Sequence, residues 1–192
     1  MKVIDISRIF NSETPIYPGD IPPKFERINK IENDNFNRTF MSMSVHCGTH
    51  VDAPNHFISK GKAIHELDLS VFYGECTVVA FEGIIGNSEM TDILKGCQQR
   101  LLLKGQNELS ESAAYLIANS HVKLIGVESQ SVGNINHPLC VHVILLENGI
   151  IPLEGLDLST VKPGDYTLSA FPLNLWGSDG SPVRAVLIDK EY

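Results

Sequence analysis

The sequence predicts a single-domain α/β protein with a β-sheet core flanked by helices. Three observations lead to this fold class. The chain has 192 residues, enough to bury one sizeable hydrophobic core. Segments with the pattern of strands alternate with segments with the pattern of helices. No repeat, low-complexity tract or long polar linker divides the chain, so residues 1–192 are expected to form one domain.

The first part of the chain contains two predicted strands separated by a loop. Residues 3–6 are mostly apolar and indicate a short strand. Residues 11–23 hold four prolines and a glycine, which is the composition of a loop, and this loop carries Tyr17. Residues 37–45 mix polar and apolar side chains, which favours a strand with two different faces. This strand is expected to lead directly into a histidine-rich segment.

The second part alternates between strands and helices. A helix is predicted over residues 110–119, because Ser110 is a good N-terminal cap. A second helix is predicted over residues 137–148, with Pro138 in its first turn and Gly149 just past its end. Apolar runs predict further strands over residues 76–81, 101–103, 124–127, 150–153, 166–171 and 183–188. The order of these strands in the sheet cannot be deduced from the pattern.

Composition excludes several classes of protein. The net charge is −8 and there is no run of lysine or arginine, so binding to nucleic acid is not expected. The N-terminus has no apolar stretch of signal-peptide length, and no apolar run is long enough to cross a bilayer. The four cysteines are far apart and form no CxxC pair, which argues against a zinc ribbon or a disulfide scaffold. A cytoplasmic protein that contacts no membrane is expected.

Chemistry-bearing side chains concentrate in the segment HCGTHVDAPNH, which holds three of the seven histidines. A tight turn at Cys-Gly-Thr could aim His46 and His50 at one point. If the chain is extended after the turn, His50 and Asp52 project from the same face. Two imidazoles and a carboxylate suit zinc, manganese or iron(II), and three ligands leave positions open for water, as in catalytic sites.

His56 is assigned to proton transfer. It lies four residues beyond Asp52, after the stiffening Pro54, near enough to reach a water molecule at the metal without being a ligand. The alternative is that the histidines of this segment only cap turns or satisfy hydrogen bonds in the core. Cys47, inside the segment, is interpreted as a bystander that points away from its histidine neighbour.

The whole chain resembles the cyclase family of metal-dependent hydrolases, which includes bacterial kynurenine formamidase. The family signature HxGTHxDAPxH is matched at every fixed position from His46 to His56. The segments DISRIFNSETPIYPGD, GVESQSV and PLEGLDLSTVKPGDYTLSAFPLNLWGSDGSPVRAVLI also look like those of the family. The resemblance implies a mixed sheet of the swivelling β/β/α type. Glu128, where relatives commonly have aspartate, and a modest chain length depart from the pattern and leave the substrate open.

The resemblance also implies further ligands and partners. In formamidase relatives a histidine twelve residues before a glutamate joins it near the metal, and His142 and Glu154 have this spacing here. One ion would be held by His46, His50 and Asp52, and a second where Asp52, His142 and Glu154 meet. One or two ions of zinc or manganese per subunit are therefore expected, with His56 as acid/base. The resemblance further implies a homodimer or homotetramer, in which the N-terminal loop of one subunit helps to close the pocket of another.

Three aromatic residues are candidates for a substrate pocket, although such residues more often pack in cores: Tyr17, Phe57 and Trp176. The loop before Phe40 and the loop at residues 177–181 are candidate pocket walls. Arg184 is expected to form a structural ion pair with an acid such as Asp179.

The predicted function is hydrolysis of a small amide, at a carbon–nitrogen bond other than a peptide bond. A divalent metal would activate water, and His56 would accept its proton and later protonate the leaving amine. The resemblance points to an arylformamidase-type reaction, with N-formylkynurenine, an intermediate of tryptophan catabolism, or a similar small molecule as substrate. One alternative is hydrolysis of a cyclic amide or lactone, as by isatin hydrolase. The other is a metal-binding protein without enzymatic activity.

Overall fold

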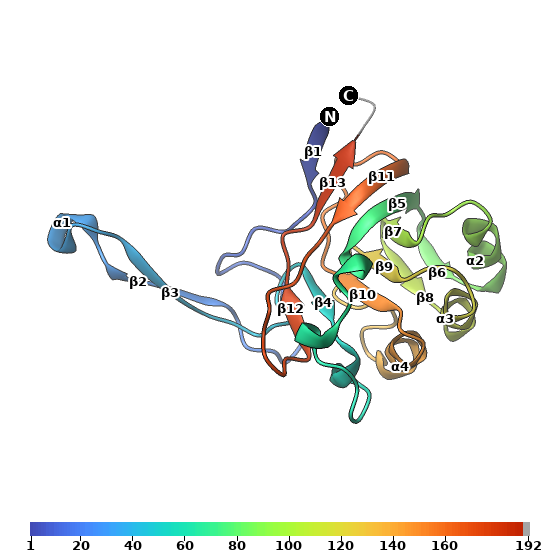
Figure 1. Ribbon diagram of the computed structural model, residues 1–192, viewed down its shortest axis with the longest axis horizontal. Coiled ribbons are helices and arrows are strands. Elements are labelled where there is room, and N and C mark those ends of the chain that lie inside the picture. Colours follow the sequence, from blue (N-terminus) through green and yellow to red (C-terminus); the bar gives the residue numbers. More distant parts are fainter. Residues whose placement is uncertain (190–192) are drawn as a thin grey trace.

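A nine-stranded mixed sheet forms the centre of the computed structural model, which describes residues 1–189 (Figure 1). The end of the predicted domain, residues 190–192, lies outside the described residues. The strands occur in the order β1 (Lys2–Asp5), β13 (Val186–Asp189), β11 (Gly164–Ser169), β5 (Tyr73–Ala80), β7 (Arg100–Lys104), β9 (Leu124–Val127), β10 (Ile151–Glu154), β4 (His50–Asp52) and β12 (Gly180–Pro182). The four central strands, β5, β7, β9 and β10, are parallel, and the strands outside them pair antiparallel.

Hydrophobic cores cover both faces of the sheet. Successive residues of a strand point to opposite faces, so Leu101 and Leu103 of β7 enter one core, whereas Leu102 enters the other. The helices α2 (Asn87–Leu94), α3 (Glu111–Ala118) and α4 (Leu139–Glu147) lie together on one side (Figure 1). A short parallel pair, β6 (Gly83–Ile85) and β8 (Asn107–Leu109), lies beside them. The molecule is a single-domain α/β protein, as expected.

One hairpin projects far from the rest of the molecule (Figure 1). It consists of β2 (Lys24–Asn29), the one-turn helix α1 (Ile31–Asp34) and β3 (Arg38–Ser42). We call residues 24–42 the arm. In the described part of the chain its strands pair only with each other, and all five residues of β3 are exposed. An isolated two-stranded ribbon has little intrinsic stability in water, so the arm is an unusual feature for a lone chain.

The predicted elements are found with shifted ends. Ser110 caps α3 by accepting a hydrogen bond from the backbone of Ala113, as expected. The strand predicted over residues 37–45 was too long, because β3 ends at Ser42 and does not run into the histidine-rich segment. The elements α2, β2, β4, β6, β8 and β12 were not predicted as such, nor were three 3-10 turns, η1 (Pro54–His56), η2 (Ile64–Glu66) and η3 (Leu69–Phe72). Within residues 1–189, no helix is long and apolar enough to cross a membrane.

Candidate metal centre

The histidine-rich segment begins with a tight turn and continues as β4. Gly48 has φ +67°, a conformation that other residues rarely adopt, and a Cβ at this position would lie 2.5 Å from the ring of Phe10. The turn therefore requires glycine for two reasons. Beyond it, His50 and Asp52 lie two residues apart on β4 and both side chains are buried. The segment is extended after the turn, as the sequence analysis assumed.

Long-range pairing brings Glu154 and His142 to the same place. Glu154 is the last residue of β10 and lies directly opposite His50 in the antiparallel β10–β4 pair. His142 lies on α4, in the connection between β9 and β10. Both side chains are buried, each with only 3 % of its surface exposed. Residues about 100 positions apart in the chain thus surround one point.

The side-chain atoms of this cluster lie within contact distance of one another. His46 Nδ1 is 3.0 Å from Asp52 Oδ1, and His142 Nε2 is 3.4 Å from Asp52 Oδ2. His142 Nε2 also lies 3.0 Å from Glu154 Oε1, and His50 Nε2 lies 3.4 Å from Glu154 Oε2. All five metal ligands predicted from the sequence are therefore brought together.

Hydrogen bonds to the backbone orient two of the imidazole rings. His50 Nδ1 donates to the carbonyl of Gly48 at 3.0 Å, and His142 Nδ1 donates to the carbonyl of Pro138 at 2.8 Å. Each ring then directs Nε2 toward the two carboxylates. Metal-binding histidines are commonly oriented in this way. The nitrogen that faces the carbonyl carries the proton, which leaves the other nitrogen free to bind the metal.

Within residues 1–189, two groups of three residues have the spacing of a metal site. The first consists of His46, Asp52 and His56, and the second of His50, Asp52 and Glu154. Within each group the ligand atoms lie within 4.8 Å of one another, and Asp52 belongs to both. Both groups differ from the predicted ones: the first contains His56, predicted not to be a ligand, in place of His50, and the second contains His50 in place of His142.

The charges of the cluster fit a divalent cation. Burial raises the pKa of Asp52, but hydrogen bonds and charge from the surrounding histidines outweigh this effect and hold it well below its usual range. Burial lowers the pKa of His46 and His142, yet contacts with the acidic residues raise these values to about 9 and about 10. Without a metal, the carboxylates are thus neutralised by protons on histidines. Asp52 Oδ2 is buried, and no group within residues 1–189 donates a hydrogen bond to it. A cation could replace these protons and bind the free oxygen.

Metal affinity should therefore rise with pH. At pH 7 a pKa of about 9 for His46 and about 10 for His142 means that both rings are protonated, so a cation must displace their protons. The apparent affinity for Mn²⁺ or Zn²⁺ should increase about tenfold per pH unit for each proton displaced. Titration calorimetry between pH 6.5 and 8.5, in buffers of different ionisation enthalpy, measures both quantities. An affinity that does not change with pH would contradict this picture.

His56 lies at the rim of the cluster. Its ring stacks on that of His46, with 4.0 Å between the centroids and 27° between the planes. Burial is the main reason why the pKa of His56 is lowered, in contrast to that of His46. His56 is thus neutral at pH 7 and can accept a proton, which is what a general base requires.

Asp179 was missed as a site residue by the sequence analysis. Its Oδ2 lies 3.2 Å from His46 Nε2 and 3.4 Å from His56 Nδ1, so one carboxylate contacts both stacked rings. Its backbone carbonyl accepts a hydrogen bond from Ala53, directly after β4. The expected ion pair of Arg184 with an acid is found, but the partner is Asp5 and not the suggested Asp179. The only signal in the sequence is the position of Asp179 in the loop 177–181, a predicted pocket wall, but no residue of this loop is among those that line the cavity.

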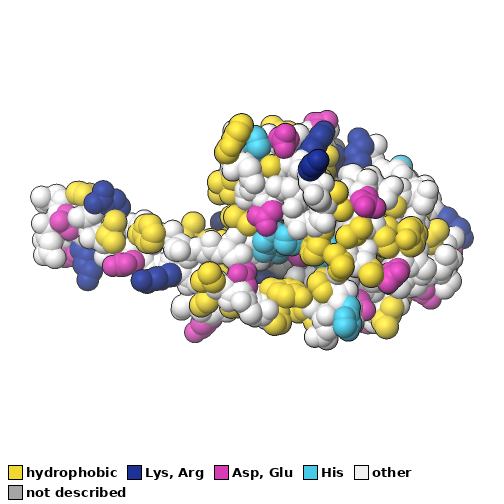
Figure 2. All heavy atoms as spheres, turned by 90° about the horizontal axis from the view of Figure 1, so that it is seen from below, with side chains coloured by type: hydrophobic (Ala, Val, Ile, Leu, Met, Phe, Trp, Pro, Cys, Tyr) yellow, Lys and Arg dark blue, Asp and Glu magenta, His cyan; other side chains and the backbone are white. Residues whose placement is uncertain are grey.

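A cavity of about 290 Å³ opens onto the cluster. Figure 2 shows histidine side chains near the middle of the face of the molecule that it draws. Tyr17 and Phe57 line the cavity, together with Asp20, Ser44, His46, His50, His56, Gln130, Ser131, Pro138, His142 and Glu154. Trp176 does not line it: its side chain is 90 % exposed and contacts the ring of His65 instead. The residues before Phe40 belong to the arm and do not line it either, so that expected wall is absent among the described residues.

Comparison with known sequences connects the chain to one family. The family described as "Putative cyclase" matches residues 4–134. A kynurenine formamidase of Geobacillus thermodenitrificans is 38 % identical over 200 aligned residues, which cover 96 % of each chain. A kynurenine formamidase of Bacillus cereus is 36 % identical over the same share of both chains.

Solved structures have the same fold. A potential metal-dependent hydrolase with cyclase activity superposes with a TM-score of 0.86 and 26 % identity, covering 100 % of this chain and 99 % of its own. A predicted metal-dependent hydrolase from Bacillus stearothermophilus has a TM-score of 0.83 and 26 % identity, with 97 % of each chain covered. Isatin hydrolase A from Labrenzia aggregata has a TM-score of 0.83 at 19 % identity, covering 97 % of this chain and 93 % of its own, a likeness of fold alone.

Proposed function

The chain belongs to the cyclase family, and on this premise we propose that it is a metal-dependent hydrolase that cleaves the formamide group of a small aromatic substrate. One observation carries the proposal: two buried carboxylates face three histidines beside a cavity, with the neutral His56 at its rim. A storage or sensing site has no need of a proton-transfer group beside its ligands. The arrangement therefore favours an enzyme over a protein that only binds metal.

The donor atoms would hold one or two divalent cations. His46, His50, Asp52, His142 and Glu154 are the proposed ligands, with zinc or manganese as the ion. Imidazole and carboxylate groups suit both metals. A cation bound here would supply a Lewis acid, which polarises a carbonyl group and makes a water molecule acidic near neutral pH.

His56 would move the proton during the reaction. Its neutral ring accepts a proton from the attacking water, and the resulting imidazolium protonates the leaving aniline nitrogen. The contact between His56 Nδ1 and Asp179 Oδ2 would hold the ring in place and favour its charged form while it carries the proton. The aromatic rings of Tyr17 and Phe57 would line the cavity around the substrate ring.

The names of relatives supply the first substrate to test. Two relatives named kynurenine formamidase align with almost the whole chain, so N-formylkynurenine is proposed as the substrate class. Purified protein loaded with Mn²⁺ or Zn²⁺ should hydrolyse N-formylkynurenine faster than isatin, and a chelator should remove the activity. Preference for isatin would favour hydrolysis of a cyclic amide. Inactivity of metal-loaded protein on both compounds would overturn the proposed substrate class.

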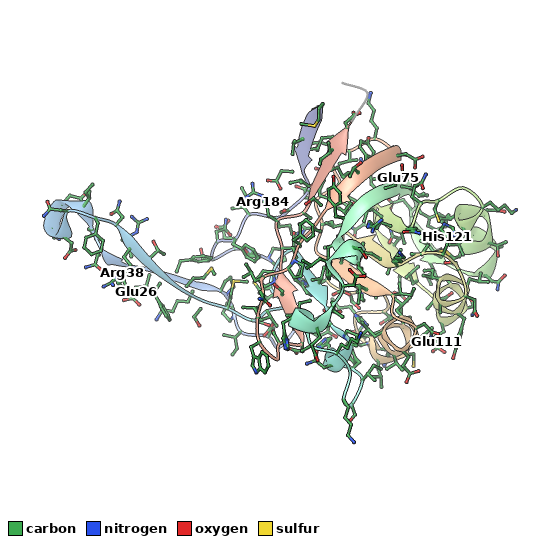
Figure 3. All side chains as sticks on the ribbon, in the orientation of Figure 1. Glu26, Arg38, Glu75, Glu111, His121 and Arg184 are labelled. Atoms are coloured by element: carbon green, nitrogen blue, oxygen red, sulfur yellow. The ribbon has the colours of Figure 1, made fainter. Side chains whose placement is uncertain are left out.

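The arm supports a further proposal, that the enzyme is a homodimer or homotetramer. Large apolar side chains are exposed along its strands and helix: Phe25, Ile28, Ile31, Phe36, Phe40 and Met41. The polar residues Glu26 and Arg38 also lie on the arm, far from the rest of the chain (Figure 3). A projecting ribbon with this many exposed apolar side chains is typical of an element that packs on another subunit.

Disruption of the apolar arm should shift the oligomer toward monomer. Replacing Phe25 and Phe40 with serine removes two aromatic side chains that are 40 % and 53 % exposed, without changing any buried residue of the sheet. Light scattering after gel filtration should show a lower mass than for the unmodified protein. The matched control replaces Lys24 and Glu26, two polar residues of β2, with serine. This variant should keep the mass of the unmodified protein. An unmodified protein that is monomeric at micromolar concentration would contradict the role of the arm.

We further propose that residues 1–192 act as one domain in the cytoplasm. All four cysteines are free thiols, and three of them are buried. Reduced cysteines without disulfide partners are typical of a reducing compartment.

A further inference from the structure

A tight turn holds two side chains at the cavity. Tyr17, Pro18, Gly19 and Asp20 form it, with the backbone N–H of Asp20 donating to the carbonyl of Tyr17 at 3.0 Å. Gly19 has φ +91°, and proline followed by glycine in this conformation is the pattern of a type II turn. Tyr17 and Asp20, the two ends of the turn, both line the cavity.

A hydrogen bond ties this turn to the opposite wall of the cavity. The hydroxyl of Tyr17 donates to the backbone carbonyl of Ile135 at 2.5 Å. Ile135 lies in the loop before α4, and Pro138 of the same loop also lines the cavity. The backbone carbonyl of Tyr17 closes the turn, and its hydroxyl binds the loop before α4. These two contacts fix the position of Asp20 relative to the metal cluster.

Among the described residues, the carboxylate of Asp20 has no cationic partner. Its Oδ1 accepts a hydrogen bond from the backbone N–H of Ile21 at 2.7 Å, and no hydrogen bond or ion pair to Oδ2 is found within residues 1–189. No lysine or arginine is among the described residues that line the cavity. Asp20 is half-buried, and its negative charge attracts a cationic group that enters the cavity.

We infer that Asp20 determines ligand specificity by binding the primary ammonium group on the side chain of an aryl ligand in the cavity. The inference rests on the proposed function and assigns a residue to recognition of the amine of its substrate. The formamide end lies at the metal cluster, the aromatic ring lies near Tyr17 and Phe57, and the ammonium group lies at Asp20. Because Asp20 contacts the part of the substrate that does not react, it acts on binding and leaves the chemical step unchanged.

Asp20→Asn separates this role from a structural one. An asparagine side-chain oxygen can still accept the hydrogen bond from Ile21, so the turn is kept while the charge is lost. The matched control is Glu13→Gln, which removes a charge from an exposed residue of the same loop that does not line the cavity.

Two matched substrates show whether the ammonium group is recognised. One is N-formylkynurenine, and the other is its deaminated analogue, 4-(2-formamidophenyl)-4-oxobutanoate, which keeps the formamide, ring and carboxylate. Asp20→Asn should raise KM for N-formylkynurenine about tenfold at a nearly unchanged kcat. It should leave both constants for the deaminated analogue within about twofold. Glu13→Gln should change neither.

Binding of products distinguishes failure of this inference from failure of the proposed function. Calorimetry measures the binding of L-kynurenine and of deaminated kynurenine to metal-loaded protein, with no need for turnover. If N-formylkynurenine is hydrolysed but Asp20→Asn affects amine and deaminated compounds equally, the inference is overturned and the function stands. If no formamide is hydrolysed but Asp20→Asn weakens the binding of L-kynurenine alone, the inference stands and the proposed function fails. The inference is also overturned if L-kynurenine and deaminated kynurenine bind with equal affinity and if this affinity is the same for the unmodified protein and for Asp20→Asn.

Discussion

Replacing Asp52 with asparagine should lower kcat/KM by about 1,000-fold or more and remove tight metal binding. Asp52 is the residue common to both candidate groups of ligands, so its loss affects every arrangement of one or two ions. Lewis-acid stabilisation of a transition state is worth several kcal/mol, and about 4 kcal/mol corresponds to a factor of about 1,000 in rate. Metal content after dialysis and the rate on N-formylkynurenine are the two measurements.

The fold of the Asp52→Asn variant should survive. Asparagine has nearly the shape of aspartate, but loss of the charge removes the ion pairs of this residue with the protonated rings of His46 and His142. The melting temperature without metal should fall while unfolding stays cooperative. The increase on adding Mn²⁺ or Zn²⁺ should disappear. Asp92→Asn, the same change on the exposed surface of α2, is the control and should keep the metal response. Full activity of Asp52→Asn would refute the proposed metal centre.

The second large effect is expected for His56→Ala. The variant should lose about 100-fold to 10,000-fold in kcat, the usual contribution of a general acid/base, while metal content stays close to that of the unmodified protein. Its lowered pKa and its position at the rim of the cluster are the physical reasons for this assignment. Rates at saturating substrate and elemental analysis of the same sample measure the two quantities together.

A different result for His56→Ala would reassign the residue. His56 is close enough to His46 and Asp52 to act as a ligand, so a parallel loss of metal and activity would identify it as one. Unchanged turnover would exclude both roles. His121→Ala is the control: His121 contacts Cys97 and lies apart from the cavity, so this variant should keep both rate and metal.

Local sequence predicted the part of the site that depends on neighbouring residues. The turn at Gly48 and the extended segment after it place His46, His50 and Asp52 through backbone geometry alone. Residues two apart on a strand share a face wherever that strand lies in the fold. For the same reason the alternating strands and helices and the Ser110 cap were predicted correctly, since each depends on a short stretch of chain.

Long-range packing decided the rest of the site. Glu154 reaches the cluster only because β10 pairs with β4 in the register that places it opposite His50, and a register of this kind is not visible in either strand alone. The twelve-residue spacing of His142 and Glu154 predicted their proximity only through the resemblance to a family. Asp179 lies in the loop before β12, 133 positions after His46 in the chain. It contacts His46 and His56 because β12 pairs with β4.

The aromatic residues show the same division. The sequence alone predicted the chemistry of the site, because residues of the types that bind metals lie at short spacings in one local segment. Three-dimensional packing alone decided which distant side chains reach that segment: Tyr17 and Phe57 line the cavity, whereas Trp176 lies on the surface. A side chain's type indicates what it can bind, but its neighbours depend on contacts between strands and loops far apart in the chain. The position of Asp20 at the cavity and the projection of the arm were likewise decided by the tertiary structure.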